Sequence, residues 1–406
     1  MTAPPSPADE RIPFVLDLAS ALHEAGHATH RLEEALLATG ERLGLHGQYF
    51  ATPTSIFASF GQAAVQQTFM LRTHPRPPDL GRLSRVTAIA RAVLRGDVSL
   101  PEGSRRLAGL ANRPAPGAIP LVAAHALASG AAARFLGGAG PEIAVAAAAG
   151  TLIGILALVA LAVPNVGRVY ELLAAFACSA AVAAAGAAVG GFSVSIATLA
   201  GLIVLIPGLT LTTAIAELAT SHLTAGTTRM AGAFMTFIAI GFGVALGARV
   251  AAMAVGPAPS VAPGTIGPAA NWVALAATGV AFAILLRADR DDLGWIIASG
   301  VLAFVATRAG GALLGPELGV FVGALAVGLG GSLVSRLTER PAAVLLVPGL
   351  LTLVPGSVGF RSISALLDNQ VVAGIDTAFT MIMTAVSLVA GLLTAAAIYP
   401  ERPLTS

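Results

Sequence analysis

Five residues near the N-terminus match a metal-binding motif. The segment His23-Glu24-Ala25-Gly26-His27 reads H-E-x-x-H, and on a helix its two histidines would share one face, where they could bind zinc with Glu24 as general base. His30 would continue that face. However, a peptidase of this type should pair the motif with a third ligand and a substrate cleft, and a chain without lysine has no P-loop for an ATP-dependent membrane protease. We therefore favour a solvated helix edge and predict no metal or other cofactor. A membrane-anchored zinc peptidase is the alternative from another class.

A second kind of chemistry is indicated by proline and glycine in apolar sequence. Residues 205–213 (LIPGLTLTT), 347–350 (VPGL) and 354–357 (VPGS) each contain a Pro-Gly pair. Proline removes a helical N–H donor, and the freed backbone groups must find partners inside the protein or in a water-filled cavity. Two such broken helices could present dipoles and hydroxyls to a polar solute near the middle of a membrane, whereas two structural kinks are the alternative. The predicted substrate-binding residues are Pro207, Gly208, Thr210, Thr212, Thr213, Pro348, Gly349, Pro355, Gly356, Ser357 and Arg361.

Ionisable residues close to these segments are candidates for coupling transport to protons. Glu217 and Asp376 are the two we select, because a charge inside a membrane is costly and usually faces a cavity or a partner. Glu217 could instead bind a substrate amine, and Arg361 could pair with a carboxylate of the substrate or of the protein. Each of these residues could also lie at the membrane interface, solvated by headgroups.

The composition indicates which elements must position these residues. Of the 406 residues, 56% are hydrophobic and 11% charged, with a mean hydropathy of +0.82; a soluble domain usually carries about 25% charged residues. The net charge of +2 gives no support for nucleic-acid binding. Residues 1–115 hold 12 of the 23 arginines and 10 of the 21 acidic residues. A soluble N-terminal domain therefore precedes a membrane domain.

Periodicity predicts the elements of both parts. In the soluble α+β domain we expect a helix from Phe14 to about Leu43, ended by Gly44, and a strand over 49–60 interrupted at Pro53. Two arginine-rich helices should follow at 80–95 and 100–110. A membrane span needs about 20 mostly apolar residues. Ten candidates satisfy this: 118–136, 142–163, 169–190, 193–213, 230–252, 269–287, 293–309, 317–336, 341–358 and 371–399. Glycine pairs four residues apart, such as Gly243 and Gly247, predict tight helix packing.

The membrane part repeats itself. A shift of 148 residues places Pro207-Gly208 on Pro355-Gly356 and Ala225-Gly226 on Ala373-Gly374. Each half then contains five spans, and an odd number inverts the second half relative to the first, as in many transporters. We therefore predict an α-helical membrane protein with about ten transmembrane helices as two inverted five-helix repeats. Its parts are a soluble domain (1–115), repeat 1 (116–255) and repeat 2 (256–406).

Arginine placement predicts orientation. With the N-terminus inside, most arginines of the membrane part fall on the cytoplasmic side, beside the arginine-rich soluble domain. The longest loop on the opposite side, 254–268, has no charge.

Two soluble segments and the two Pro-Gly regions together resemble the threonine/serine exporter family over nearly the full chain. Residues 26–33 (GHATHRLE) resemble that family's G-x-x-T-x-R-x-E stretch, and residues 51–57 (ATPTSIF) its T-P-T-x-I-F segment. The resemblance implies a bacterial cytoplasmic membrane protein with a cytoplasmic N-terminal domain, exporting small hydroxylated amino acids such as threonine and serine by means of the proton gradient. Some members of the family divide the two halves between separate chains and are linked to dicarboxylate export, which makes a succinate-like substrate the near alternative.

The partners expected are therefore a small amino acid, protons and the lipid bilayer, and no nucleic acid. Whether copies of the chain associate is left open. A sensor or scaffold that transports nothing is a third class, and it would require a partner for the soluble domain.

Overall fold

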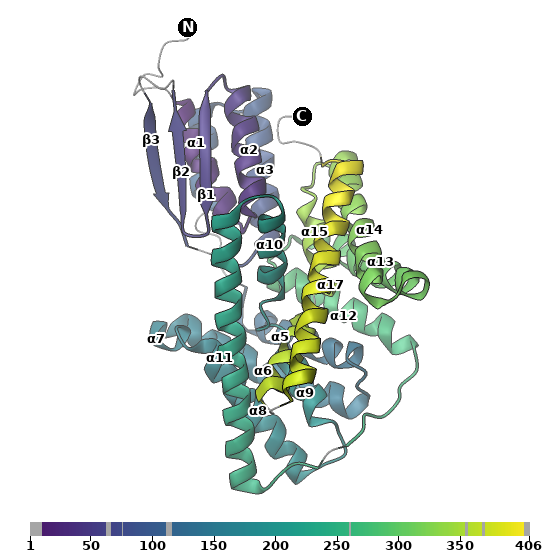
Figure 1. Ribbon diagram of the computed structural model, residues 1–406. Coiled ribbons are helices and arrows are strands. Elements are labelled where there is room, and N and C mark those ends of the chain that lie inside the picture. The colour runs from purple at the N-terminus through teal and green to yellow at the C-terminus, as the bar shows by residue number, and fades with distance from the viewer. Residues whose placement is uncertain are drawn as a thin grey trace.

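The computed structural model describes residues 10–61, 66–74, 76–110, 116–259, 261–353, 356–367 and 370–401. The soluble domain stands at one end of an elongated helical part (Figure 1). Both regions have the architecture expected from the sequence, a small α+β domain and an α-helical membrane domain.

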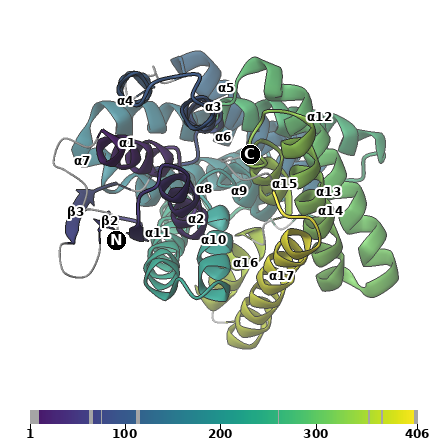
Figure 2. The same cartoon turned by 90° about the horizontal axis from the view of Figure 1, so that it is seen from above.

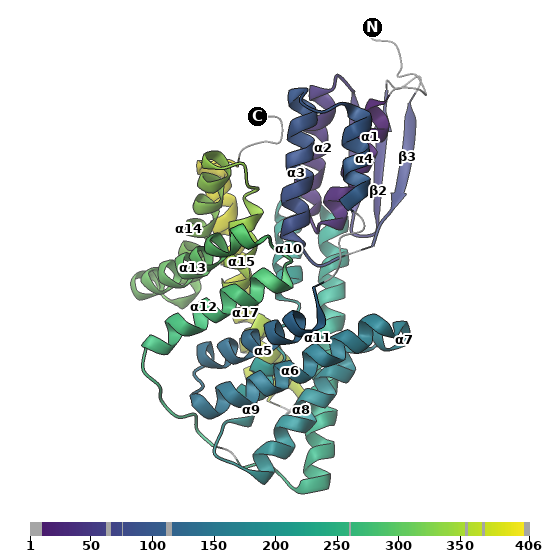
Figure 3. The same ribbon diagram turned by 180° about the vertical axis from the view of Figure 1, so that it is seen from behind.

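The soluble domain packs four helices on one face of a sheet (Figure 3). Its elements are α1 (Arg11–Glu24), α2 (Thr29–Arg42), β1 (Gly47–Thr52), β2 (Ser55–Phe60), β3 (Gln67–Arg72), α3 (Leu80–Arg95) and α4 (Leu100–Gly109). The strands form an antiparallel sheet in the order β1-β2-β3. In β2, Ile56, Ala58 and Phe60 are buried and alternate with more exposed residues, as expected when one face of a sheet covers a core. Phe14, Leu18, Leu32 and Leu36 complete that core from α1 and α2.

Two expectations for this domain are wrong. The helix predicted over 14–43 is two helices, because the chain turns at Gly26, whose φ of +81° is a conformation that glycine adopts readily. A Cβ at Gly26 would also lie 2.7 Å from the Cα of Pro78. The interrupted strand is a β1–β2 hairpin that turns at Pro53-Thr54, and the third strand, β3, had no prediction. Helices α3 and α4 confirm the two arginine-rich helices.

The membrane part is entirely helical. Among the described residues, eight helices are long and apolar enough to cross a membrane. Helices of the first half are α5 (Ala118–Phe135), α6 (Gly140–Ala162), the short α7 (Pro164–Gly167), α8 (Tyr170–Ala188), α9 (Val194–Gly201), α10 (Gly208–Ala219) and α11 (Leu223–Val255). The second half has α12 (Ala269–Leu285), the 3₁₀ turn η2 (Arg290–Asp292), α13 (Leu293–Leu314), α14 (Pro316–Leu337), α15 (Ala343–Leu353), α16 (Gly356–Leu367) and α17 (Val371–Ile398).

Each predicted span corresponds to described helices. The fourth is the broken pair α9 and α10, and the sixth is α12, whose 17 residues make it one of the shorter apolar helices. The ninth is α15 followed by α16, and α15 runs through Pro348 without a break. The helix break expected at Pro348-Gly349 is therefore wrong.

Equivalent glycines pack against the corresponding helices in the two halves. A Cβ on Gly201 would meet Ala149 and Cys178, both at 2.9 Å, and a Cβ on Gly349 would meet Ser299 and Val327 at 2.5 and 2.6 Å. Likewise, a Cβ on Gly243 in α11 would lie 2.5 Å from a carbonyl oxygen of α8, and one on Gly391 in α17 would lie 2.5 Å from a carbonyl oxygen of α14. The internal repeat is thus a repeat of packing as well as of sequence.

The repeats have opposite directions. Helix α11 runs away from the soluble domain and α17 runs toward it (Figure 1). Between these helices the two halves meet at the first residues of α10 and α16, where a Cβ on Gly356 would lie 3.4 Å from the Cα of Gly208 and 2.6 Å from the Ile206 side chain. Pro355 lies outside the described residues.

Candidate functional site

A buried ion pair lies at the end of α10 that faces the soluble domain. The Glu217 side chain is completely buried, and its two carboxylate oxygens accept hydrogen bonds of 3.1 and 3.0 Å from Nε of Arg229 in α11. A buried carboxylate is stable only when it is paired and hydrogen-bonded. The pair therefore joins the two arms of the α10–α11 hairpin.

The soluble domain supplies a third bond to Glu217. The backbone N–H of Thr29, at the first position of α2, donates to Oε1 of Glu217 over 3.1 Å. The first N–H groups of a helix have no partner within the helix, and Ala28 at the N-cap has no side-chain oxygen to accept from them. Glu217 fills this role from a distant part of the chain, and the positive end of the helix dipole favours its negative charge. Figure 2 shows α2 beside the ends of α10 and α11.

A second polar link lies next to the first. His222, in the turn between α10 and α11, has its Nε2 3.3 Å from Oε2 of Glu33 in α2. The other Glu33 oxygen accepts the N–H of Ala51 in β1 over 2.7 Å, so the carboxylate is fixed by its own domain. The hairpin tip is thereby attached to α2 and to the sheet.

A cavity of about 560 Å³ lies between the soluble domain and both membrane repeats. Pockets of about 300–1,000 Å³ are typical of small-molecule sites. Its wall from the soluble domain comes from the α1–α2 connection and from α2 and α3, and its membrane wall from α10, α15 and α17. The polar and charged lining residues are His27, His30, Arg31, Glu34, Thr87, Arg91, Thr212, Thr213, Thr220, Ser335 and Glu401.

The histidines of this cavity are neutral at physiological pH. Burial lowers the pKa of His30 to about 4, helped by the neighbouring charge of Arg31. Burial likewise lowers the pKa of His27 to about 3, again with Arg31 as a second cause. Both rings therefore offer one hydrogen-bond donor and one acceptor rather than a positive charge.

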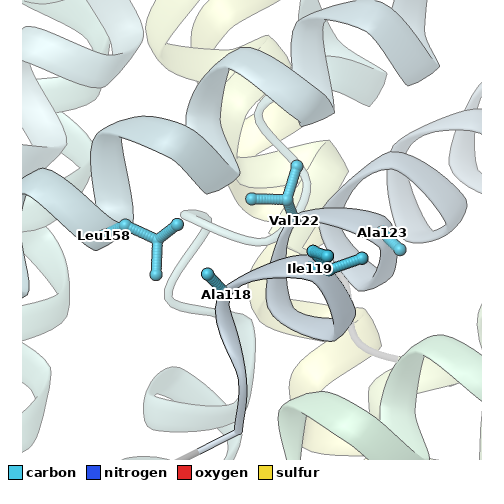
Figure 4. Close-up of a pocket in the computed structure, with 5 residues that line it drawn as sticks. All are labelled: Ala118, Ile119, Val122, Ala123 and Leu158. Atoms are coloured by element: carbon cyan, nitrogen blue, oxygen red, sulfur yellow. The ribbon is translucent and has the colours of Figure 1, made fainter.

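The other hollow described is apolar. Ala118, Ile119, Val122 and Ala123 of α5 and Leu158 of α6 line it (Figure 4). Its lining offers no polar side chain to a solute, and we assign it no binding role.

The structure does not bring the residues predicted to bind substrate together, and seven of them fall into three places. Thr212 and Thr213 line the large cavity. Gly208 and Gly356 form the contact between the repeats, with Pro207 at the N-cap of α10. Pro348 and Gly349 are buried inside α15, where Gly349 packs against Ser299 and Val327.

The remaining candidates lie elsewhere. Thr210 is half-buried on α10, and Ser357 is half-buried on α16. Arg361 on α16 and Asp376 on α17 are exposed. Glu217 and Asp376, proposed together for coupling, are thus in opposite environments, one buried in an ion pair and the other open.

Sequence reasoning missed the contribution of the soluble domain. Three residues of this domain contact the membrane part or the chain that follows it. Thr29 donates a hydrogen bond to Glu217, Arg31 forms an ion pair with Glu401, and Glu33 contacts His222. These residues belong to the G-x-x-T-x-R-x-E segment, which was the available signal. The segment indicated the family, but the sequence could not show what these residues do, because their contact partners are distant in the chain.

The H-E-x-x-H match does not form a zinc site here. The turn at Gly26 separates His23 from His27, Nε2 of His23 lies 3.1 Å from the Pro53 carbonyl oxygen, and Glu24 pairs with Arg82 at 2.6 Å. No three metal-ligand side chains come together within the described part of the chain. The favoured alternative, a solvated helix edge, is also wrong, because His23 is 5% exposed.

These features define a class of protein: a multi-span membrane protein of two inverted helical repeats, with a soluble domain closing a cavity over a broken helix. Inverted repeats with discontinuous helices are common in secondary transporters. The family described as "Putative threonine/serine exporter" matches residues 13–251, and that described as "Threonine/Serine exporter, ThrE" matches residues 271–398. The chain therefore belongs to the threonine/serine exporter family.

Its curated relatives include fungal proteins named pheromone-regulated membrane protein 10. The one from Zygosaccharomyces rouxii is 25% identical over 385 residues, covering 92% of this chain and 38% of the relative. The one from Saccharomyces cerevisiae is 24% identical over 386 residues, covering 92% of this chain and 49% of the relative. The chain thus spans less than half the length of these relatives. No solved structure matches it.

Proposed function

We propose that this protein is a proton-coupled secondary transporter that exports threonine and serine across the cytoplasmic membrane, with its soluble domain in the cytoplasm. Membership of the exporter family supports export of an amino acid. The observation that carries the proposal is the cavity, which reaches Thr212 and Thr213 near the break before α10 and lies beside the buried Glu217. It offers hydroxyls and both signs of charge, as a zwitterion with a hydroxyl requires.

In this proposal the contact between α10 and α16 is the constriction. The cavity lies on the soluble-domain side of Gly208 and Gly356, whose backbones approach closely. Export requires this contact to separate while the soluble-domain side closes. Ser357 and Arg361, which follow Gly356 in α16, would then meet the substrate on the far side.

Glu217 is the proposed proton site. Protonation removes the negative charge that Arg229 and the N–H of Thr29 stabilise, so it weakens the hairpin and its attachment to α2 together. A single proton thereby changes contacts in the membrane part and in the soluble domain, which is what coupling requires. Asp376 remains a second candidate, at the exposed start of α17.

Transport by the purified full chain tests the function directly. Proteoliposomes loaded with labelled threonine should release it when a pH gradient is imposed and should not when the gradient is collapsed. Labelled serine should compete, and labelled succinate should not. Gradient-driven movement of succinate instead would establish the dicarboxylate alternative, and the absence of flux for all three would reject the exporter.

A further inference from the structure

We infer that the soluble domain forms part of the substrate site itself, and that His30 of α2 and Thr212 of α10 recognise the hydroxyl group of the bound amino acid. This inference rests on the proposed function for the identity of the ligand. It assigns to the soluble domain a direct role in selectivity.

Two buried polar atoms without partners carry the inference. Oγ1 of Thr212 and Nδ1 of His30 are both inaccessible to solvent and have no hydrogen-bond partner among the described residues. Thr212 is 2% exposed as a whole. The two residues line the same cavity, one from the membrane wall and one from the wall formed by the soluble domain.

Such atoms are uncommon in native structures. Most buried side-chain polar atoms have a partner, and a donor or acceptor left unpaired costs about 1–3 kcal/mol. Two threonines of the same hairpin satisfy their hydroxyls within the helix: Thr220 donates to Ala216 O over 2.9 Å, and Thr227 to Leu223 O over 2.7 Å. Thr212 differs from these two by a hydroxyl that a ligand could pair.

The chemistry of the two groups fits an alcohol. A neutral imidazole nitrogen either donates or accepts, depending on the tautomer, and the Thr212 hydroxyl does both. A ligand hydroxyl also donates one hydrogen bond and accepts others, so it offers each of these atoms a partner of the kind it needs. The low pKa of His30, caused first by burial, keeps the ring neutral, so that it can pair with a ligand hydroxyl.

The charged lining suits the rest of a zwitterion. Arg31 pairs with Glu401, beyond the end of α17, and both residues line the cavity together with Glu34. An ammonium group can pair with either carboxylate, and a carboxylate group can pair bidentately with the Arg31 guanidinium. The proposed ligand is thus a small amino acid with a side-chain hydroxyl.

A selectivity measurement on the full chain tests the inference. Binding of threonine and of 2-aminobutyrate, which lacks only the hydroxyl group, is measured by calorimetry on the purified protein in nanodiscs. The wild type should prefer threonine at least tenfold, because a site built to pair a hydroxyl rejects a ligand without one. Thr212→Val and His30→Leu should each reduce this preference about fivefold or more, with 2-aminobutyrate affinity little changed. Thr212→Ser, which keeps a hydroxyl group, should retain the preference for threonine over 2-aminobutyrate.

Thr278→Val is the matched control, because the Thr278 hydroxyl donates to Ala274 O within α12 and is not part of the cavity. Its preference for threonine should equal that of the wild type. A wild type that binds both ligands equally or binds neither, or variants that keep the full preference, would overturn the inference. If selectivity depends on these residues but proteoliposomes show no export, the proposed function fails and the binding site stands. If export occurs with selectivity independent of both residues, only the inference fails.

Discussion

The two helical hairpins at the centre of the molecule, α10–α11 and α16–α17, have the same construction but different chemistry. In each hairpin a short helix is followed by a long helix that packs by a glycine against a neighbour, Gly243 in one and Gly391 in the other. The 148-residue shift places Glu217 on Ala365, His222 on Gln370 and Arg229 on Thr377. The second hairpin therefore has no ionisable residue at the positions equivalent to this buried pair.

The described part of the second hairpin joins its arms by an uncharged hydrogen bond. The Ser362 hydroxyl donates to the Gly374 carbonyl over 2.7 Å, at positions equivalent to Ala214 and Gly226. Only the first hairpin has its tip bound to the soluble domain in the described structure. The comparison indicates that duplication preserved the packing, whereas the Glu217–Arg229 pair has no counterpart at the equivalent positions Ala365 and Thr377 of the second repeat.

Removing the cation from the first hairpin should have the largest effect on stability. Arg229→Met leaves the completely buried Glu217 without its charged partner, and breaking a buried pair in this way costs about 3–5 kcal/mol. Thr377→Met at the equivalent position of α17 should change stability by less than about 0.5 kcal/mol, as is usual for surface sites. Unfolding of both variants in the same detergent measures the difference, and equal losses would contradict the asymmetry.

The glycine contacts should be equally sensitive in the two halves. Gly243→Ala and Gly391→Ala each place a methyl group 2.5 Å from a backbone carbonyl oxygen, so each should destabilise the protein by about 1–3 kcal/mol through overpacking. Gly232→Ala, in α11 with no atom within 4 Å of its added Cβ, should be neutral or slightly stabilising. Thermal unfolding midpoints of the three variants test whether packing is symmetric; a loss in one half only would show that it is not.

Neutralising Glu217 and neutralising Asp376 should have different effects on transport. Glu217→Gln should reduce gradient-driven threonine export by about tenfold, equivalent to about 1.4 kcal/mol, and remove its dependence on pH. Asp376→Asn, in the exposed position of the second repeat, should export within about twofold of the wild type, because this side chain lies outside the buried Glu217–Arg229 pair. Initial rates at several pH values provide the measurement. A pH-dependent Glu217→Gln variant would transfer the coupling role away from Glu217.

The soluble domain should lose stability as the pH falls. His30 has a pKa of about 4 when folded, below the value of about 6.5 in an unfolded chain. The unfolded state therefore binds a proton first, so stability that is complete above pH 6.5 declines as the pH drops toward 4. Between pH 6.5 and 5.5 the loss is about 1 kcal/mol for this histidine.

Hydrogen exchange of the α1–α4 amides at these pH values measures the loss. His30→Leu should make the profile shallower without flattening it, because burial also lowers the pKa of His27 and of His23. His46→Gln, at an exposed position, should leave the profile unchanged. A wild-type profile that does not vary over this range would contradict the neutral state of His30.

Much of the membrane architecture was predictable because it depends on local properties. The length and apolarity of a span are contained in about 20 consecutive residues, and each predicted span is occupied by described helices. Errors occurred where distant contacts override local patterns. The packing of Pro78 beside Gly26 breaks the expected long helix, and α15 continues through Pro348. The residues of strand β3 alternate between half-buried and exposed, and the strand is identified by its pairing with β2.

By itself, the sequence determined that a charged α+β domain precedes ten apolar segments and that the second five repeat the first. It also determined that Pro-Gly pairs occupy equivalent places, since composition, periodicity and repetition can be read along one chain. Only the tertiary structure decided that Glu217 receives the N–H of a residue 188 positions away, and that His30 and Thr212 share one cavity. The partner of a buried polar group is set by the packing of whole elements, so these pairings arise only when the soluble domain and the two repeats come together.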